Sequence, residues 1–206
     1  MKYIEKGPAP AELERWKALV NRDWEPDFDN MTRAVKDDLK GTLIHEQGGL
    51  CCYCEKSIDM NDSHLEHFQP QSDENIDPLD YANLLCSCMQ SPIRGEIRHC
   101  GHCKGNWFDE ELLISPLDPE CGDAFAFDGD GHIFPNHTRV DAAATTIKKL
   151  GLDCEKLVAL RRAALVPFLD PDLDSVEFLE FVDGYLGRRD DGMFNAHWSA
   201  VRFVFS

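Results

Sequence analysis

The sequence predicts an α+β fold in which a small zinc-stapled core is flanked by N-terminal and C-terminal α-helices. Two observations support this prediction. Between Leu50 and Asn106 the chain carries seven of its nine cysteines and four of its eight histidines. On either side of this stretch, apolar residues recur at helical spacing. We therefore expect three parts, which are a helical brace (residues 1–49), the metal-bearing core (50–112) and a β-hairpin followed by helices (113–206).

The composition is that of an ordinary globular protein, with 206 residues, 43% apolar and 29% charged. No apolar run follows the first basic residue, Lys2, so we expect no signal peptide. No run of about eighteen apolar residues is present either, so no membrane span is expected. We place the protein in the cytoplasm. In that reducing compartment, an odd number of closely spaced cysteines favours metal thiolates over disulfides.

The formal net charge of −17 bears on any contact with nucleic acid. Phosphate contacts require Lys and Arg, so a chain this acidic should bind nucleic acid poorly by itself. The basic residues Arg94, Arg98 and Lys104 nevertheless lie inside the cysteine-rich stretch. These residues could form a local basic patch at the site, or a partner could supply the main surface that binds nucleic acid. An acidic exterior that only aids solubility is compatible with both.

Two helices are predicted in the N-terminal brace. The first covers residues 8–22, with Pro near its start. The second runs from about Asn30 to Gln47. We expect it to end at Gly48 and Gly49, because glycine tolerates the left-handed conformation common at helix ends.

The cysteines of the core predict a metal site. Cys51 and Cys54 form a knuckle, because two thiolates three residues apart on a tight turn can reach one tetrahedral zinc. A four-cysteine zinc has a closed coordination sphere, so it would hold the fold together and catalyse nothing. The second half of the site must come from four later cysteines: Cys86, Cys88, Cys100 and Cys103.

A second layer of polar residues lies between the two cysteine sets. Residues 64–68 (HLEHF) read as a short strand, whose alternation sends Glu66 to one side and His67 to the other. An acidic residue beside a histidine can bind a divalent metal while the histidine stays free as general base. Taken alone, the pair could equally be polar residues of a strand. Its position between the cysteine sets, with Asn83 and Lys104 downstream, favours catalysis.

The C-terminal region begins with a hairpin signal. The run Asp128-Gly129-Asp130-Gly131 separates two short apolar stretches and predicts a tight β-turn. It lacks the ligand spacing of an EF-hand, so we prefer the turn to a calcium loop. Helices are then expected over about 138–150 (opened by a Thr138-x-x-Asp141 cap and ended by Gly151), 154–169 (ended by Asp170-Pro171-Asp172), 175–186 and 195–205.

The order of these motifs resembles the HNH nucleases, which have a ββα-metal fold that is often stapled by a four-cysteine zinc. Six segments are similar, more specifically, to the HNH subunit of Septu-type antiphage systems (PtuB), a family that includes retron-associated nucleases. This similarity runs from the second predicted helix to about Leu169. The segments are CCYCE, LEHFQPQS, YANLLCSC, HCGHCKGN, SPLDPEC and TIKKLGLDCEKLVALR.

The resemblance implies a role for each matching residue. His67 would be the general base that activates water, and Glu66 would bind a catalytic Mg²⁺ or Mn²⁺. Asn83 would hold the loop that orients His67, and Lys104 would contact the scissile phosphate. By the same alignment, the zinc ligands would be Cys51, Cys54, Cys88 and Cys100.

Two departures from the family pattern leave alternatives open. Many HNH proteins carry Asn or His directly after the fourth cysteine as a metal ligand, whereas this chain has Gly101 there. His102, Asn106 or water would then fill that position. The second zinc half-site is also split by a long loop, so Cys86 and Cys103 stay alternatives for two of the zinc ligands.

The resemblance further implies a metal-dependent endonuclease acting on nucleic acid, DNA rather than RNA, as the effector subunit of a bacterial antiphage defence complex. Its partner would be an ATPase of the SMC/ABC type (PtuA), which would regulate it within a hetero-oligomer and contribute nucleic-acid binding. The acidic net charge fits such a division of labour. We expect the C-terminal helices to form the docking surface.

Two other functions compete with this one. A non-catalytic zinc-binding interaction module would keep its function in a His67→Ala variant and lose it in Cys54→Ser. A nuclease would instead lose cleavage in His67→Ala and keep its fold and zinc. Thiol redox chemistry at the Cys51 and Cys54 knuckle is disfavoured, because no thioredoxin-like βαβ pattern surrounds the motif.

Overall fold

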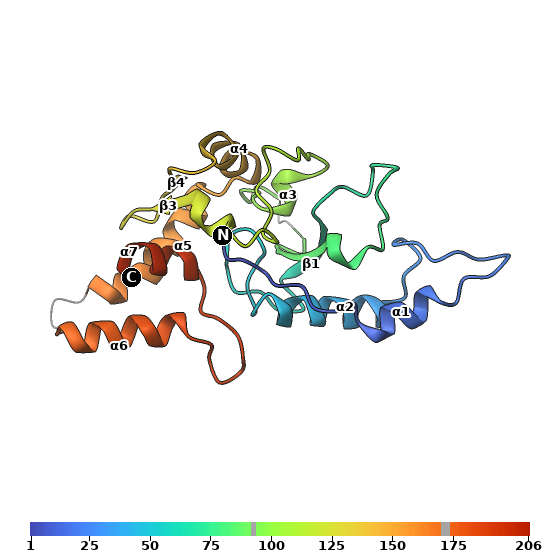
Figure 1. Cartoon of the computed structure of the whole chain (residues 1–206), viewed down its shortest axis with the longest axis horizontal. Coiled ribbons are helices and arrows are strands. Elements are labelled where there is room, and N and C mark those ends of the chain that lie inside the picture. Colours follow the sequence, from blue (N-terminus) through green and yellow to red (C-terminus); the bar gives the residue numbers. More distant parts are fainter. Residues whose placement is uncertain (92–93, 170–173) are drawn as a thin grey trace.

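The computed structural model describes residues 1–91, 94–169 and 174–206. It is a mixed structure of helices and two small antiparallel sheets, which confirms the predicted α+β class. The N-terminal helices and the C-terminal helices lie at opposite ends of the molecule, with the cysteine-rich stretch between them (Figure 1). The predicted strand and helix segments are all present, several with shifted ends.

The N-terminal part contains α1 (Ala11–Lys17) and α2 (Arg33–Glu46). Helix α1 is shorter than predicted, and the residues after it form turns. Helix α2 begins at Thr32, whose side chain accepts a hydrogen bond from the Val35 amide. Its end is as predicted, because the two residues that follow Gln47 adopt φ values of 63° and 74°, which glycine reaches without strain.

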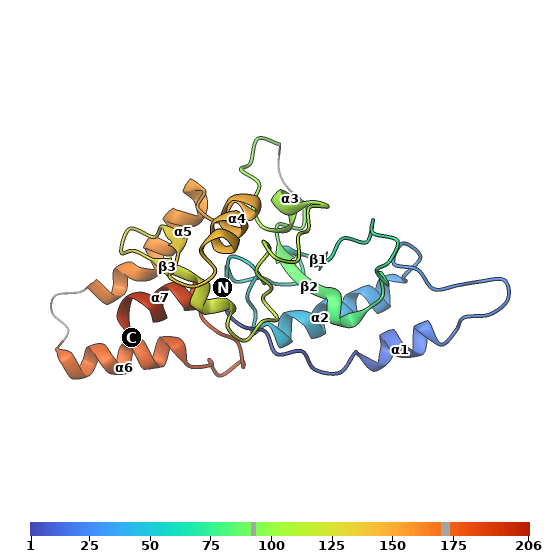
Figure 2. The same cartoon turned by 45° about the horizontal axis from the view of Figure 1, so that its top comes forward.

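The central part is a two-stranded antiparallel sheet of β1 (Ser63–His67) and β2 (Leu84–Cys88). Its register places Leu65 opposite Cys86. A single 3₁₀ turn, η1 (Tyr81–Asn83), leads into β2, and the one-turn helix α3 (Gly101–Lys104) follows the long loop. Strand β2 is buried along its whole length, and it contacts both β1 and α2 (Figure 2).

The predicted hairpin is confirmed. A 3₁₀ turn, η2 (Cys121–Ala124), precedes β3 (Phe125–Phe127), which pairs antiparallel with β4 (Ile133–Pro135). The turn between the strands is closed by a hydrogen bond from the Gly131 amide to the Asp128 carbonyl, with 3.1 Å between N and O.

The helices of the C-terminal region match the prediction in number and order. Gly151 ends the first of them in the left-handed conformation, with φ of 60°. The predicted Thr138 cap is wrong, because the Thr138 hydroxyl donates to the Asp123 carbonyl and Arg139 occupies the N-cap position. The predicted break at residues 170–172 lies outside the described residues. The elements are α4 (Val140–Leu150), α5 (Glu155–Leu165), η3 (Val166–Leu169), α6 (Ser175–Leu186) and α7 (Trp198–Phe205).

Most of the buried side chains form one core that joins the N-terminal helices, the central sheet, the hairpin and α4. A second, smaller core lies among the C-terminal helices and includes Leu165, Phe168 and Val182. The central sheet is therefore braced from both sides of the sequence. Among the described helices, none combines the length and apolar character needed to cross a bilayer.

Candidate metal and catalytic centre

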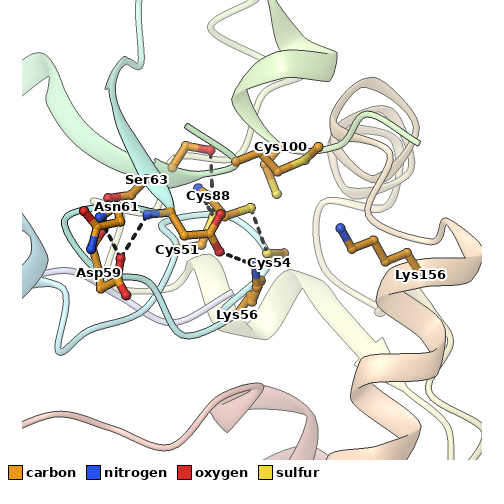
Figure 3. Close-up of polar contacts among 12 residues, drawn as sticks. Cys51, Cys54, Lys56, Asp59, Asn61, Ser63, Cys88, Cys100 and Lys156 are labelled. Carbon is orange, nitrogen blue, oxygen red and sulfur yellow. Dashed lines mark hydrogen bonds and ion pairs between the residues drawn. The ribbon is translucent and has the colours of Figure 1, made fainter. Parts of the chain in front are cut away.

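Four cysteine side chains converge at the centre of the molecule (Figure 3). Their Sγ atoms all lie within 4.8 Å of one another, and Cys54 Sγ is 3.7 Å from Cys88 Sγ. Zinc–sulfur bonds of about 2.3 Å in a tetrahedral site place the sulfurs about 3.8 Å apart. The group fits a metal ion such as zinc. Its members are Cys51, Cys54, Cys88 and Cys100, and we call them the cysteine group.

Separate elements position these four thiols. Cys51 and Cys54 lie on the turn after α2, and the Cys88 amide at the end of β2 donates to Cys51 Sγ at 3.3 Å. Cys100 follows the long loop and has a φ of 56°. Its amide donates to the Leu150 carbonyl at 2.7 Å, so the end of α4 fixes this last thiol.

The electrostatics of the cysteine group are those of a site for a cation. Burial alone would raise the pKa of Cys51, but hydrogen bonds from Cys100 and the other neighbouring thiols lower it well below its usual value. Burial and those same neighbours raise the pKa of Cys100. The group therefore favours a negative charge on the buried Cys51 sulfur, which a divalent metal would stabilise.

Two of the alternative cysteines lie elsewhere. Cys86 is buried in β2, where its thiol donates to the Lys40 carbonyl at 3.7 Å and burial raises its pKa to about 12. Cys103 is exposed on α3. His99 is a buried histidine for which the sequence motifs predict no role. It lies beside the cysteine group, with Nδ1 3.2 Å from Cys100 Sγ.

Glu66 is the centre of the second cluster. It lies on β1 with only 7% of its surface exposed. Its Oε1 accepts from the Tyr53 hydroxyl at 3.1 Å and pairs with Lys104 Nζ at 2.9 Å. Its Oε2 faces His64 Nε2 at 3.4 Å. Burial alone would raise the pKa of Glu66, but His64 and Lys104 lower it, so the carboxylate is charged at neutral pH.

His67 lies on the opposite face of β1, as the alternation predicts. Its Nε2 lies 2.9 Å from the Pro78 carbonyl oxygen. A carbonyl only accepts, so Nε2 carries the proton and Nδ1 keeps its lone pair. The ring packs edge-on against Phe28, with 4.5 Å between the centroids. Burial is the main cause that lowers the pKa of His67, so the imidazole is neutral at pH 7.

Asn83 ties down the chain that follows His67. Its Oδ1 accepts from the Gln69 amide at 2.7 Å, and its Nδ2 donates to the Gln69 carbonyl at 2.9 Å. The Asn83 carbonyl also accepts from the Phe68 amide at 3.0 Å. This reciprocal contact fixes the direction in which the strand leaves His67.

Lys104 and His102 are both drawn into contacts within the protein. The Lys104 side chain is 2% exposed, and besides Glu66 it donates to the His67 carbonyl at 2.9 Å. Its ammonium thus lies between the two predicted catalytic residues, Glu66 and His67. The His102 ring packs against His64 at an interplanar angle of 46°, with 4.5 Å between centroids, and its Nε2 bonds to the Met89 carbonyl.

The sequence motifs predict no role for Tyr53 or Met89. Tyr53 lies between the two knuckle cysteines, so the sequence does predict that it is close to the cysteine group. Its hydrogen bond to Glu66 depends on tertiary packing, and no motif predicts it. Met89 contributes only a backbone carbonyl, for which no side-chain pattern exists.

Two known proteins are similar to this chain over most of its length. A protein of Vibrio cholerae serotype O1 biovar El Tor, named "Retron Vc95 putative HNH endonuclease", is 34% identical over 157 residues, covering 70% of this chain and 72% of the relative. A protein of Escherichia coli, named "Retron Ec83 putative HNH endonuclease", is 25% identical over 207 residues, covering 82% of this chain and 80% of the relative. No family model matches the chain.

The class that the fold and site define is a small α+β protein with a cysteine group that could hold a metal beside a carboxylate and a histidine. Its similarity to the Vibrio cholerae relative extends over more than two thirds of both chains. The chain belongs to the HNH endonuclease family.

Proposed function

We propose that this protein is a metal-dependent HNH endonuclease that hydrolyses phosphodiester bonds of nucleic acid. The observation that carries the proposal is the geometry of His67. Its Nε2 is fixed on the Pro78 carbonyl, which leaves Nδ1 as a neutral base on a partly buried ring. A positioned neutral imidazole is suited to remove a proton from water.

The neighbouring residues would each support that step. His67 Nδ1 takes the proton of the attacking water, and Asn83 keeps the imidazole in place through residues 68 and 69. Glu66 would hold Mg²⁺ or Mn²⁺ through Oε2, since Oε1 is engaged by Tyr53 and Lys104. A bound divalent ion supplies positive charge to the phosphate and the leaving oxygen.

In this proposal, β1, β2 and α3 form the ββα-metal core, and the cysteine group holds a structural zinc. The zinc ligands Cys51, Cys54, Cys88 and Cys100 contribute no chemistry, because all four coordination positions are filled. Lys104 acts as a positioning residue between Glu66 and the His67 backbone.

We further propose that the protein is the effector subunit of a cytoplasmic antiphage complex that acts on DNA with a partner ATPase of the PtuA type. The net charge of −17 supports a partner that supplies nucleic-acid binding. Helix α6 exposes Val176 and Leu179, at 65% and 59% of their surface, which supports docking through the C-terminal helices.

The proposal is tested by a cleavage assay with Mg²⁺ or Mn²⁺, with and without the partner ATPase, on DNA and RNA. The His67→Ala variant should lose cleavage by about 10²- to 10⁴-fold, the usual contribution of a general base. Its zinc content and thermal unfolding should match those of the wild type. The exposed His137, which follows β4, provides the matched control, because His137→Ala should cleave normally.

Two results would contradict the proposal. If the wild type cleaves no nucleic acid under either condition, the nuclease assignment is wrong. If His67→Ala keeps full function while Cys54→Ser loses it, the protein is a zinc-binding interaction module.

A further inference from the structure

His64 is a polar residue of β1 for which the sequence motifs predict no role. It precedes Glu66 by two positions, so the two side chains lie on the same face of the strand. His64 Nε2 is 3.4 Å from Glu66 Oε2. The other oxygen, Oε1, is already engaged by Tyr53 and Lys104. The pair therefore presents one carboxylate oxygen and one imidazole nitrogen side by side.

The other nitrogen of His64 defines what Nε2 can do. His64 Nδ1 lies 3.2 Å from the Met89 carbonyl oxygen, which can only accept, so Nδ1 carries a proton. In a neutral ring, Nε2 then has a free lone pair directed at a carboxylate. Two such electron-rich atoms at this distance repel each other, and a metal ion bound by both would remove that repulsion.

The Met89 carbonyl resembles the outer support of a metal-binding histidine. Histidine ligands usually donate their second N–H to a backbone carbonyl or carboxylate, which fixes the ring. Met89 has a φ of 68°, a value that costs a non-glycine residue energy. The same carbonyl also binds His102 Nε2. His102 therefore uses its Nε2 for this hydrogen bond, whereas His64 uses Nδ1 and keeps Nε2 available.

Gly101 packs directly against this pair. A Cβ atom at this position would lie 2.3 Å from Glu66 Oε2 and 2.8 Å from His64 Nε2. Only glycine therefore lets the start of α3 approach the two atoms without displacing them. Two ligands bound at about 2.1 Å lie about 3.0 Å apart at an octahedral angle and about 3.4 Å apart at a tetrahedral angle. The observed separation of 3.4 Å lies at the wide end of this range, so one ion can contact both atoms.

We propose that His64 Nε2 and Glu66 Oε2 together bind the divalent cation, with the Met89 carbonyl orienting His64 and Gly101 allowing α3 to pack against both side chains. This inference rests on the proposed nuclease function, which requires such a cation but does not name its second protein ligand. It assigns to His64 the place that the family pattern gives to the residue after the fourth cysteine. The remaining coordination positions would face water and the phosphate.

The test is a titration of the full-length, zinc-loaded protein with Mn²⁺, followed by calorimetry or by the electron paramagnetic resonance of free Mn²⁺. His64→Asn retains a side-chain amide that can donate to Met89 but has no atom at the Nε2 position. We expect it to weaken Mn²⁺ affinity by at least about tenfold, with unchanged zinc content. His64→Gln, which can place an oxygen near that position, should lose less.

Gly101→Ala is the second variant, since it keeps every ligand but places a methyl group against Glu66 Oε2 and His64 Nε2. It should displace the two side chains and so weaken Mn²⁺ binding, with zinc content showing that the cysteine group is intact. The control is His67→Ala, which removes the base and should bind Mn²⁺ like the wild type. If His64→Asn binds Mn²⁺ as tightly as the wild type or more tightly, His64 is only a charged partner of Glu66 and the inference is wrong.

The two proposals fail separately. Cleavage that requires His67 and a divalent ion, combined with normal Mn²⁺ affinity in His64→Asn, would refute the His64 site and leave the nuclease assignment standing. Mn²⁺ binding that depends on His64, in a protein that cleaves no nucleic acid, would support the site and refute the nuclease.

Discussion

The cysteine group and the Glu66 cluster lie side by side but differ in what they leave open. The four thiols are at most 6% exposed and close a tetrahedron, so a metal held there meets no further ligand. Glu66 and His64 present two atoms side by side, and the His64 side chain is 21% exposed. In the proposed function, the first arrangement is the structural site and the second is the reactive one.

The comparison also shows how one arrangement supports the other. Tyr53, between two thiols of the cysteine group, donates to Glu66. Gly101 directly follows another of these thiols and packs against Glu66, where a Cβ atom would lie 2.3 Å from Oε2. From the far side, the α7 N-terminus holds the knuckle, because the His197 amide donates to the Glu55 carbonyl at 2.9 Å. The cysteine group therefore fixes the backbone segments that carry residues of the Glu66 cluster.

The largest effect should come from breaking the closed group. Cys54→Ser removes one of four thiolates, and structural zinc in small domains contributes about 10–16 kcal/mol of apparent binding energy. The net stability of a domain is about 5–15 kcal/mol, so this variant should lose zinc, unfold its core and stop cleaving. Zinc content and thermal unfolding measure this.

Cys103→Ser is the control for that variant, because the Cys103 side chain is exposed and lies outside the cysteine group. It should retain zinc and stability. Full zinc content and an unchanged unfolding temperature in Cys54→Ser would show that the four thiols are not a structural metal site.

A smaller, graded effect on the cleavage rate should come from pH, which changes the protonation of the His67 imidazole. Protonation of the base stops the reaction, so the rate should fall as pH drops through the pKa of His67. Burial lowers this pKa below the usual value near 6.5. The rate should therefore be flat near pH 7 and decline about tenfold per unit only at a more acidic pH.

The measurement is a single-turnover cleavage rate against pH, with zinc content followed in parallel to exclude metal loss. A midpoint at or above 6.5 would mean either that His67 is not the base or that its ring is more solvated than the contacts with Phe28 and Pro78 indicate.

Local patterns predicted much of this molecule. The two glycines after α2, the turn at residues 128–131 and the opposite faces of Glu66 and His67 each follow from a few neighbouring residues, and the structure has them. Where only a local pattern supported a cap, at Thr138, a long-range contact with the Asp123 carbonyl overrode it.

The site was predictable only in part, for the same reason. The sequence offered four candidates for the second cysteine pair. What separates Cys100 from Cys103 is the Leu150 carbonyl, fifty residues away, which binds the Cys100 amide. The ion pair between Lys104 and the buried Glu66 joins residues that lie 38 positions apart in the sequence, and no motif predicted it. Such choices are made by tertiary packing, which residue spacing does not encode.

The smallest effect is expected at Tyr53, the residue that joins the two sites. Tyr53→Phe keeps the buried ring and removes only the hydroxyl that donates to Glu66. A hydrogen bond to a charged group contributes about 1.5–3 kcal/mol, so the free energy of unfolding should fall by about that amount. Because Lys104 still pairs with Glu66 Oε1, we expect zinc to be retained and cleavage to fall only several-fold.

Tyr81→Phe is the matched control, because the Tyr81 hydroxyl also donates to a glutamate at 3.2 Å, and this glutamate, Glu46, lies at the end of α2, outside the cysteine group and the Glu66 cluster. It should lower the free energy of unfolding in denaturant and leave the cleavage rate unchanged. Equal losses of cleavage in the two variants would assign the effect to general stability. A loss confined to Tyr53→Phe would show that the cysteine knuckle orients the catalytic carboxylate through this hydroxyl.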